Sequence, residues 1–183
     1  MKRRRSCAVL GHSPMRFAWG FDEEDHACNI LKTVLLQQIQ SLRAAEVCDF
    51  WVACDPGVGL WCAEMINVLR EQDADLRLYC HTPYEEQATK WAPYLRKRYF
   101  DMLEKCTHMS AEHTRKAPSA QADAYRAIIR QSDIVLAVYD ISSLRGDAVD
   151  EAMAYAEIEK KPAILIHPDT FEATYIESRK NSS

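Results

Sequence analysis

Residues 134–139, with the sequence Ile-Val-Leu-Ala-Val-Tyr, form the apolar run that most constrains how this chain can fold. The run is rich in β-branched residues and far too short to span a membrane, so it predicts a β-strand. Because it lacks polar alternation, both of its faces should be buried, which is typical of a parallel sheet with helices on each side. The remaining sequence should therefore supply further strands and the helices that cover them.

The other predicted elements alternate between strand and helix. Short apolar segments that stop at turn residues predict strands at residues 7–10, 50–54, 76–80 and 163–167, while 107–113 could be a short strand or a loop. Apolar residues at helical spacing predict helices at residues 26–46, 60–71, 119–131 and 148–160, and a long helical stretch at 84–106 that Pro93 kinks or breaks. This alternation predicts the α/β class, as a three-layer, Rossmann-like, doubly wound and mainly parallel sheet with helices on both faces.

The length of 183 residues fits one domain. We expect a flexible basic N-terminus at residues 1–6, a Rossmann-like domain at 7–169 and a frayed tail at 170–183. The seven cysteines include no pair at Cys-x-x-Cys spacing, and no signal peptide precedes them. They predict reduced thiols in a cytoplasmic protein, with no metal site.

Charge and hydropathy bear on the partners of the chain. The net charge is −4, and the one basic cluster, residues 2–5, is more typical of a solvated terminus than of a nucleic-acid contact. No stretch approaches the 18 apolar residues of a membrane span. The sequence therefore predicts against both nucleic acid and membranes as partners. The segment 84–106 could supply the face of a homodimer, although a helix that packs on the core fits equally well.

The turn after the second predicted strand is the most informative segment for function. Gly57, Val58 and Gly59 lie between that strand and a helix. Glycine permits positive φ angles and close approach of a ligand, and the following helix presents free amides and partial positive charge. A phosphate or carboxylate suits this geometry. The pattern Gly-x-Gly is nevertheless weak on its own, and a tight turn without any ligand remains the alternative.

Several other residues should lie at the same edge, because ligands of doubly wound sheets bind beyond the carboxyl ends of the strands. Glu64 could hold a ribose hydroxyl or act as an acid/base, or could simply pair with Arg70. Trp91 could cover a ligand or pack in the core, and Gly146 could add an amide or merely begin a helix. Strand-end candidates complete the set: Gly11, His12, Thr82, Pro83 and Tyr139.

Several well-known active-site motifs are absent from the sequence. It has no phosphate-binding Gly-x-x-x-x-Gly-Lys-[Ser/Thr] loop, no Gly-x-Ser-x-Gly elbow and no zinc-deaminase signature. These absences predict against P-loop NTPases, ordinary α/β-hydrolases and zinc deaminases.

Four ordered motifs resemble those of the YpsA-like family in the SLOG superfamily, which also contains DprA-like and lysine-decarboxylase-like domains. Gly11-His-Ser-Pro14 is similar to the family's Gly-Tyr-Lys-Pro, and Gly57-Val-Gly-Leu-Trp-Cys-Ala-Glu64 to its Gly-x-Glu-Leu-Trp-Ala-Ala-Glu. Thr82-Pro83 with the stretch to Trp91, and Ser132-Asp133 before the apolar strand, complete the match over about residues 7–168. The resemblance implies a site for a nucleotide or nucleotide derivative, framed by Gly11, Gly57, Gly59, Trp61, Glu64, Thr82, Pro83, Trp91 and Tyr139.

Two segments depart from the family pattern. Ala124-Tyr125 stand where members carry Arg-Asn, and Arg145-Gly146-Asp147 replace a Gly-Gly-Thr turn. The leading hypothesis is a sensor or regulatory domain without enzymatic activity that binds a nucleotide or ADP-ribose-like small molecule and has no other cofactor. The alternatives are an enzyme that hydrolyses a nucleotide derivative with Glu64 as acid/base, and an interaction scaffold with a degenerate site.

Overall fold

The computed structural model describes residues 3–178 and contains a seven-stranded sheet. The strand order is β4-β3-β2-β1-β5-β6-β7, and every pair is parallel except β6 with β7. The strands are β1 (Arg5–Gly11), β2 (Val47–Val52), β3 (Arg77–Tyr84), β4 (His108–His113), β5 (Ile134–Val138), β6 (Ala163–Ile166) and β7 (Ala173–Ile176). The predicted α/β class and mainly parallel, doubly wound sheet are confirmed.

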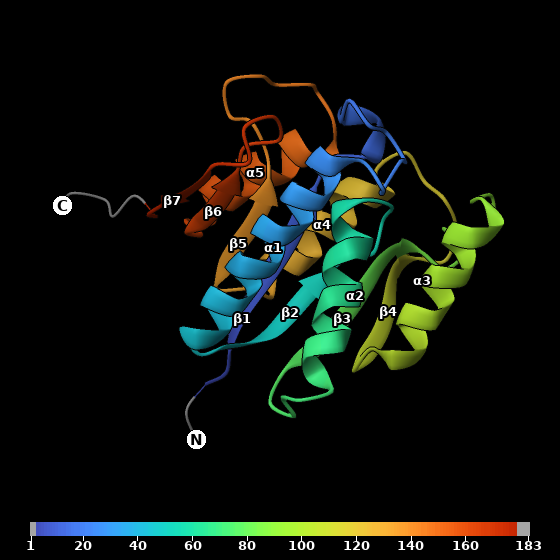
Figure 1. Ribbon diagram of the computed structural model, residues 1–183, viewed down its shortest axis with the longest axis horizontal. Helices are drawn as coiled ribbons and strands as arrows, with labels where there is room; N and C mark the ends of the chain where they lie inside the picture. The colour runs from blue at the N-terminus through green and yellow to red at the C-terminus, as the bar shows by residue number, and fades with distance from the viewer. Residues whose placement is uncertain (1–2, 179–183) are drawn as a thin grey trace.

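Helices cover both faces of this sheet (Figure 1). One face carries three helices, α1 (His26–Ala44), α2 (Val58–Arg70) and α3 (Pro93–Lys105), and the opposite face carries two, α4 (Ala120–Arg130) and α5 (Ala148–Ile158). A short 3-10 helix, η1 (Pro14–Arg16), follows β1. All five residues of β5 are buried, as its unbroken apolar sequence predicts.

Capping residues set several helix starts. Asp25 begins α1 by accepting hydrogen bonds from the amides of Ala27 and Cys28, and Asp147 does the same for α5. Pro93 does not kink a long helix: it stands in the first turn of α3. The strand β3 continues through Pro83 to Tyr84, residues 85–90 form turns, and residues 91–92 lead into α3.

The two ends of the described chain also differ from the sequence-based expectation. Arg3 and Arg4 pair with Asp133 and Asp49, and β1 already begins at Arg5. The stretch expected to fray contains β7, which pairs with β6. Residues 1–2 and 179–183 lie outside the described range, so those parts of the two terminal predictions stay predictions.

Candidate functional site

The sheet changes direction of winding between β1 and β5. Ligands of doubly wound sheets bind beyond the carboxyl ends of the strands at such a point, which defines the switch-point crevice. The loops after β1, β2 and β5 gather at this end of the molecule (Figure 1). Of the sequence-predicted residues, they bring Gly11, His12, Gly57, Val58 and Tyr139 to one place.

Asp55 is the central titratable group of this crevice. Its carboxyl oxygen Oδ2 accepts a hydrogen bond of 2.9 Å from the Tyr125 hydroxyl, which also lies 3.2 Å from the Gly11 carbonyl oxygen. Burial raises the pKa of Asp55 to about 6, although the hydrogen bond from Tyr125 acts in the opposite direction. The residue as a whole is half-buried, and its carboxyl lies between the Tyr125 hydroxyl and Gly59. A carboxyl whose pKa is strongly shifted, at the switch point of the sheet, is a candidate functional group.

The first turn of α2 is shaped around this carboxyl. Gly57 is the N-cap with φ +90°, a conformation that favours glycine, and no side chain hydrogen-bonds to the first amides of the helix. A Cβ on Gly59 would lie 2.9 Å from Asp55 Oδ1, so only glycine leaves room for the carboxyl. The chain thus places its own negative charge beside the positive end of α2.

His12 connects β1 to α5 across the crevice. Its ring is 3% exposed, and Nδ1 lies 2.8 Å from Asp147 Oδ2, while the same ring stacks on Tyr139 with centroids 5.9 Å apart. Burial, together with the nearby carboxylate of Asp150, raises the pKa of the Tyr139 hydroxyl. His12 and Tyr139 therefore pack together between the loops that follow β1 and β5.

Gly146 directly precedes Asp147, the N-cap residue of α5. It has φ +70° and open space around it. Its amide and that of Arg145 already donate to Asp150 Oδ2. These amides would have to leave Asp150 before they could bind a ligand.

Two other sequence-predicted residues, Trp61 and Glu64, lie away from the crevice on the α1 and α3 side of α2. Trp61 is 3% exposed, packs near Phe17 and carries the Lys32 ammonium over its ring. Both carboxyl oxygens of Glu64 accept hydrogen bonds from Arg98, at 2.9 and 2.8 Å. The hydrogen bond from Arg98 to Glu64 is the largest contribution that raises the pKa of this guanidinium.

The remaining three predicted residues belong to the β3 and α3 side of the molecule. Thr82 is buried, and its hydroxyl donates to the Ser110 carbonyl oxygen at 3.3 Å. Pro83 is buried in the same strand, and Trp91 packs edge-on against Tyr99 with ring centroids 5.0 Å apart. The structure gives these side chains packing partners and does not bring them to the switch point.

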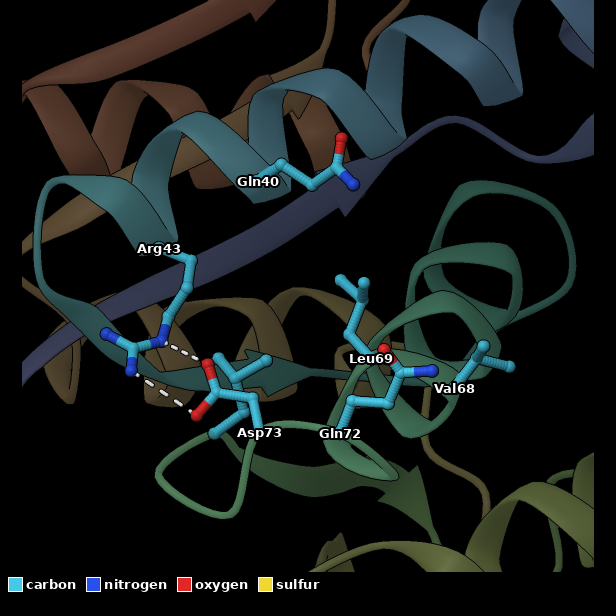
Figure 2. Close-up of a pocket in the computed structure, with 7 residues that line it drawn as sticks. Gln40, Arg43, Val68, Leu69, Gln72 and Asp73 are labelled. Atoms are coloured by element: carbon cyan, nitrogen blue, oxygen red, sulfur yellow. Dashed lines mark hydrogen bonds and ion pairs between the residues drawn. The ribbon is translucent and has the colours of Figure 1, made fainter.

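Two hollows of about 300 and 310 Å³ lie between α1 and α2. Figure 2 shows the first, where Arg43 pairs with Asp73 beside the apolar side chains of Val68 and Leu69. This hollow lies near the C-terminal ends of both helices and therefore at the opposite end of the sheet from the switch point. Within residues 3–178, no group of His, Cys, Asp or Glu side chains is arranged to hold a metal ion, and no helix has the length and apolar character to cross a membrane.

Asp55 and Tyr125 are the site residues that the sequence argument did not select. Asp55 lies two residues before Gly57, but nothing in its local sequence indicates that a tyrosine 70 positions later will donate to it. Tyr125 was noted only as a departure from the family pattern. The sequence offers one clue to this contact: an acidic residue shortly before Gly57 and a tyrosine on α4 that could donate to it.

Comparisons with known proteins agree with this architecture. Residues 7–171 match the YspA SLOG family. A UPF0398 protein of Halalkalibacterium halodurans is 27% identical over 143 residues, covering 77% of this chain and 73% of the relative. A UPF0398 protein of Bacillus cereus strain B4264 is 31% identical over 138 residues, covering 73% of each chain.

A solved structure, DNA processing protein A from Helicobacter pylori, has the same fold with a TM-score of 0.61 and 12% sequence identity. The match covers 93% of this chain and 68% of that protein, which binds single-stranded DNA. The sequence-based prediction against nucleic acid as a partner is therefore wrong, because net charge alone does not exclude nucleic acid for this fold. The matched family spans residues 7–171 and includes every motif on which the resemblance rests, so the chain belongs to the YspA SLOG family.

Proposed function

We propose that this protein binds a nucleotide or nucleotide derivative in the switch-point crevice and acts as a sensor or regulatory domain. The observation that carries the proposal is the convergence of Asp55, Tyr125 and His12 with the uncapped first turn of α2. Gln121 adds to it, because its Nε2 lies near the Asp55 carboxyl and is buried without a well-directed hydrogen bond. Polar groups that converge on one carboxyl from several elements of the fold are typical of a ligand site.

The charge of Asp55 restricts how such a ligand would bind. An ionised carboxylate beside Gly59 repels a phosphate from the α2 amides, whereas it accepts hydrogen bonds from ribose hydroxyls or a base amino group. We therefore expect the sugar or base to contact Asp55, and a phosphate to approach the α2 amides closely only when this carboxyl is protonated. ADP-ribose offers both kinds of group and is the first ligand to test.

Calorimetry and thermal shift with adenosine, AMP, ADP-ribose and cyclic dinucleotides test this proposal. We expect at least one compound to bind the wild type, and Asp55→Asn to change its affinity at least tenfold. The direction identifies the contact: Asn should strengthen binding of a phosphate at the helix terminus and weaken binding of a ribose diol. Asp101→Asn, which neutralises an exposed carboxylate on α3, is the matched control.

Two results would contradict the proposal. One is the absence of any binder at millimolar ligand. The other is a binder whose affinity responds equally to Asp55→Asn and Asp101→Asn. Chromatography of the same mixtures detects turnover, which would favour the alternative of an enzyme that hydrolyses a nucleotide derivative.

Single-stranded nucleic acid is a second candidate ligand, favoured by the DNA-binding protein of the same fold. Fluorescence anisotropy with a labelled oligothymidine, at two salt concentrations, tests it. A specific complex should weaken with salt, as phosphate contacts require, and should compete with the nucleotide if both occupy the crevice. Oligonucleotide binding unaffected by Asp55→Asn would place the contact elsewhere on the surface.

A further inference from the structure

Three polar side chains on β3 and β4 form a hydrogen-bonded chain away from the switch-point crevice. The Ser110 hydroxyl lies 2.7 Å from His81 Nδ1, and His81 Nε2 lies 2.6 Å from Glu112 Oε2. His81 and Ser110 are paired positions of adjacent strands, and Glu112 follows two residues later on the same face. Because neighbouring strands hold all three, their relative positions are fixed by the sheet.

The hydrogen-bond directions suit an activated nucleophile. If His81 is neutral and donates from Nε2 to Glu112, then Nδ1 is free to accept the Ser110 hydroxyl proton. Glu112 then orients the ring and stabilises the imidazolium that forms when the proton arrives. The ring nitrogens exchange roles relative to the common Ser-His-Asp arrangement, but the order of nucleophile, base and carboxylate is the same.

The edge of the sheet supplies a donor for a developing oxyanion. The Glu85 amide donates to the His113 carbonyl oxygen, so the backbone polar groups of His113 face β3. Groups of successive residues in a strand point in opposite directions, and β4 pairs with no described strand but β3. Ser110 lies three positions before His113, so its own amide faces the open edge. A backbone amide next to the nucleophile is the donor that tetrahedral intermediates require.

The cluster is accessible, and aromatic side chains lie beside it. The side chains of His81 and Glu112 are 15% and 31% exposed, and Ser110 is half-buried. Tyr79, two residues before His81 on the same face, stacks on Trp51 with ring centroids 4.4 Å apart. These rings could bind the acyl or aryl part of a small ester.

We propose that Ser110, His81 and Glu112 form a hydrolytic site for small carboxylic esters. Ser110 Oγ attacks the carbonyl carbon as its proton passes to His81 Nδ1. The C–O bond to the alcohol then breaks, and the leaving oxygen takes that proton. Water hydrolyses the acyl-serine with the same base, so that one ester and one water give one acid and one alcohol.

A fluorophosphonate probe, followed by peptide mapping, tests this proposal independently of nucleotide binding. We expect labelling of Ser110, its complete loss in Ser110→Ala, and at least a tenfold slower reaction in His81→Gln and Glu112→Gln. Ser143→Ala, which removes an exposed serine in the β5–α5 loop, should label like the wild type. Steady-state hydrolysis of p-nitrophenyl acetate should follow the same order.

Labelling spread over several serines, or labelling of Ser110 at an unchanged rate in a folded His81→Gln protein, would overturn the assignment. Circular dichroism of each variant establishes that it is folded. If His81→Gln does not fold, Glu112→Gln decides, because it keeps a hydrogen-bond acceptor but removes the charge that stabilises the imidazolium.

Discussion

At the scale of single residues, the ionised carboxylate of Asp55 lowers the free energy of unfolding although it lies in the candidate site. Its pKa is higher in the folded protein than in an unfolded chain, from 3.8 to about 6, because burial disfavours the charged form. The folded state therefore binds the proton more tightly, and ionisation of Asp55 favours unfolding. A group that costs stability at neutral pH is more readily explained by function than by packing.

Replacing Asp55 by Asn should therefore stabilise the protein at neutral pH. The stabilisation should be absent near pH 3.8, grow as the pH rises towards 6 and be complete above it. A shift of this size corresponds to about 3 kcal/mol, and partial exposure reduces our expectation to about 1–2 kcal/mol. Thermal unfolding of the two proteins from pH 4 to pH 8 measures it. A melting-temperature difference that does not vary with pH would show that the ionisation of Asp55 is not its cause.

At the scale of elements, the contact between β1 and α2 positions the crevice. A Cβ on Gly11 would lie 2.5 Å from both Cβ and Cγ2 of Val58, so the end of the strand and the start of the helix touch directly. Gly11 has ordinary strand geometry, and its requirement for glycine comes from close approach. The distance between the β1 loop and the α2 amides depends on this contact.

Gly11→Ala should destabilise the fold by about 2 kcal/mol, as overpacking of a rigid contact does. The double variant with Val58→Ala should recover only part of that loss, because the Val58 Cβ stays at 2.5 Å from the added carbon. Urea unfolding of the single and double variants gives the coupling free energy. Gly20→Ala adds a carbon that meets nothing within 4 Å at a φ of +55°, so it reports backbone strain without a steric clash. A Gly11→Ala protein as stable as the wild type would contradict the steric argument.

The elements that could be predicted from sequence are those whose burial pattern is strong. The completely buried strand β5 could be identified from its composition, whereas β4 and β7 are mostly exposed and leave little apolar signal. The apolar spacing of residues 84–106 predicts a long helical stretch that Pro93 kinks or breaks, because it carries no signal for the turns that separate β3 from α3. Chain order also locates the glycine turn at the sheet edge, but the Asp55–Tyr125 contact joins residues 70 positions apart and depends on tertiary structure.

At the scale of the whole molecule, the sheet has two different edges. One is the parallel strand β4, which carries the proposed hydrolytic cluster, and the other is the antiparallel strand β7. All four residues of β7 are exposed, yet the strand pairs along the full length of β6, which is mostly buried and apolar. β7 therefore contributes little to the core and instead covers the backbone groups of a strand that could otherwise pair with another molecule.

Truncation after residue 171 should therefore promote self-association more than it lowers stability. Without β7, the sequence Ala-Ile-Leu-Ile of β6 presents unpaired amides and carbonyls at an apolar edge, which is a template for pairing with a second copy. Sedimentation velocity from about 5 to 200 μM should show a concentration-dependent increase in mass for this truncation. Truncation after residue 177 keeps β7 and is the matched control. If both truncated proteins sediment alike at all concentrations, β7 does not protect the edge. Since the core on both faces stays intact, we expect the melting temperature of the shorter protein, measured at the lowest concentration, to fall by only a few degrees.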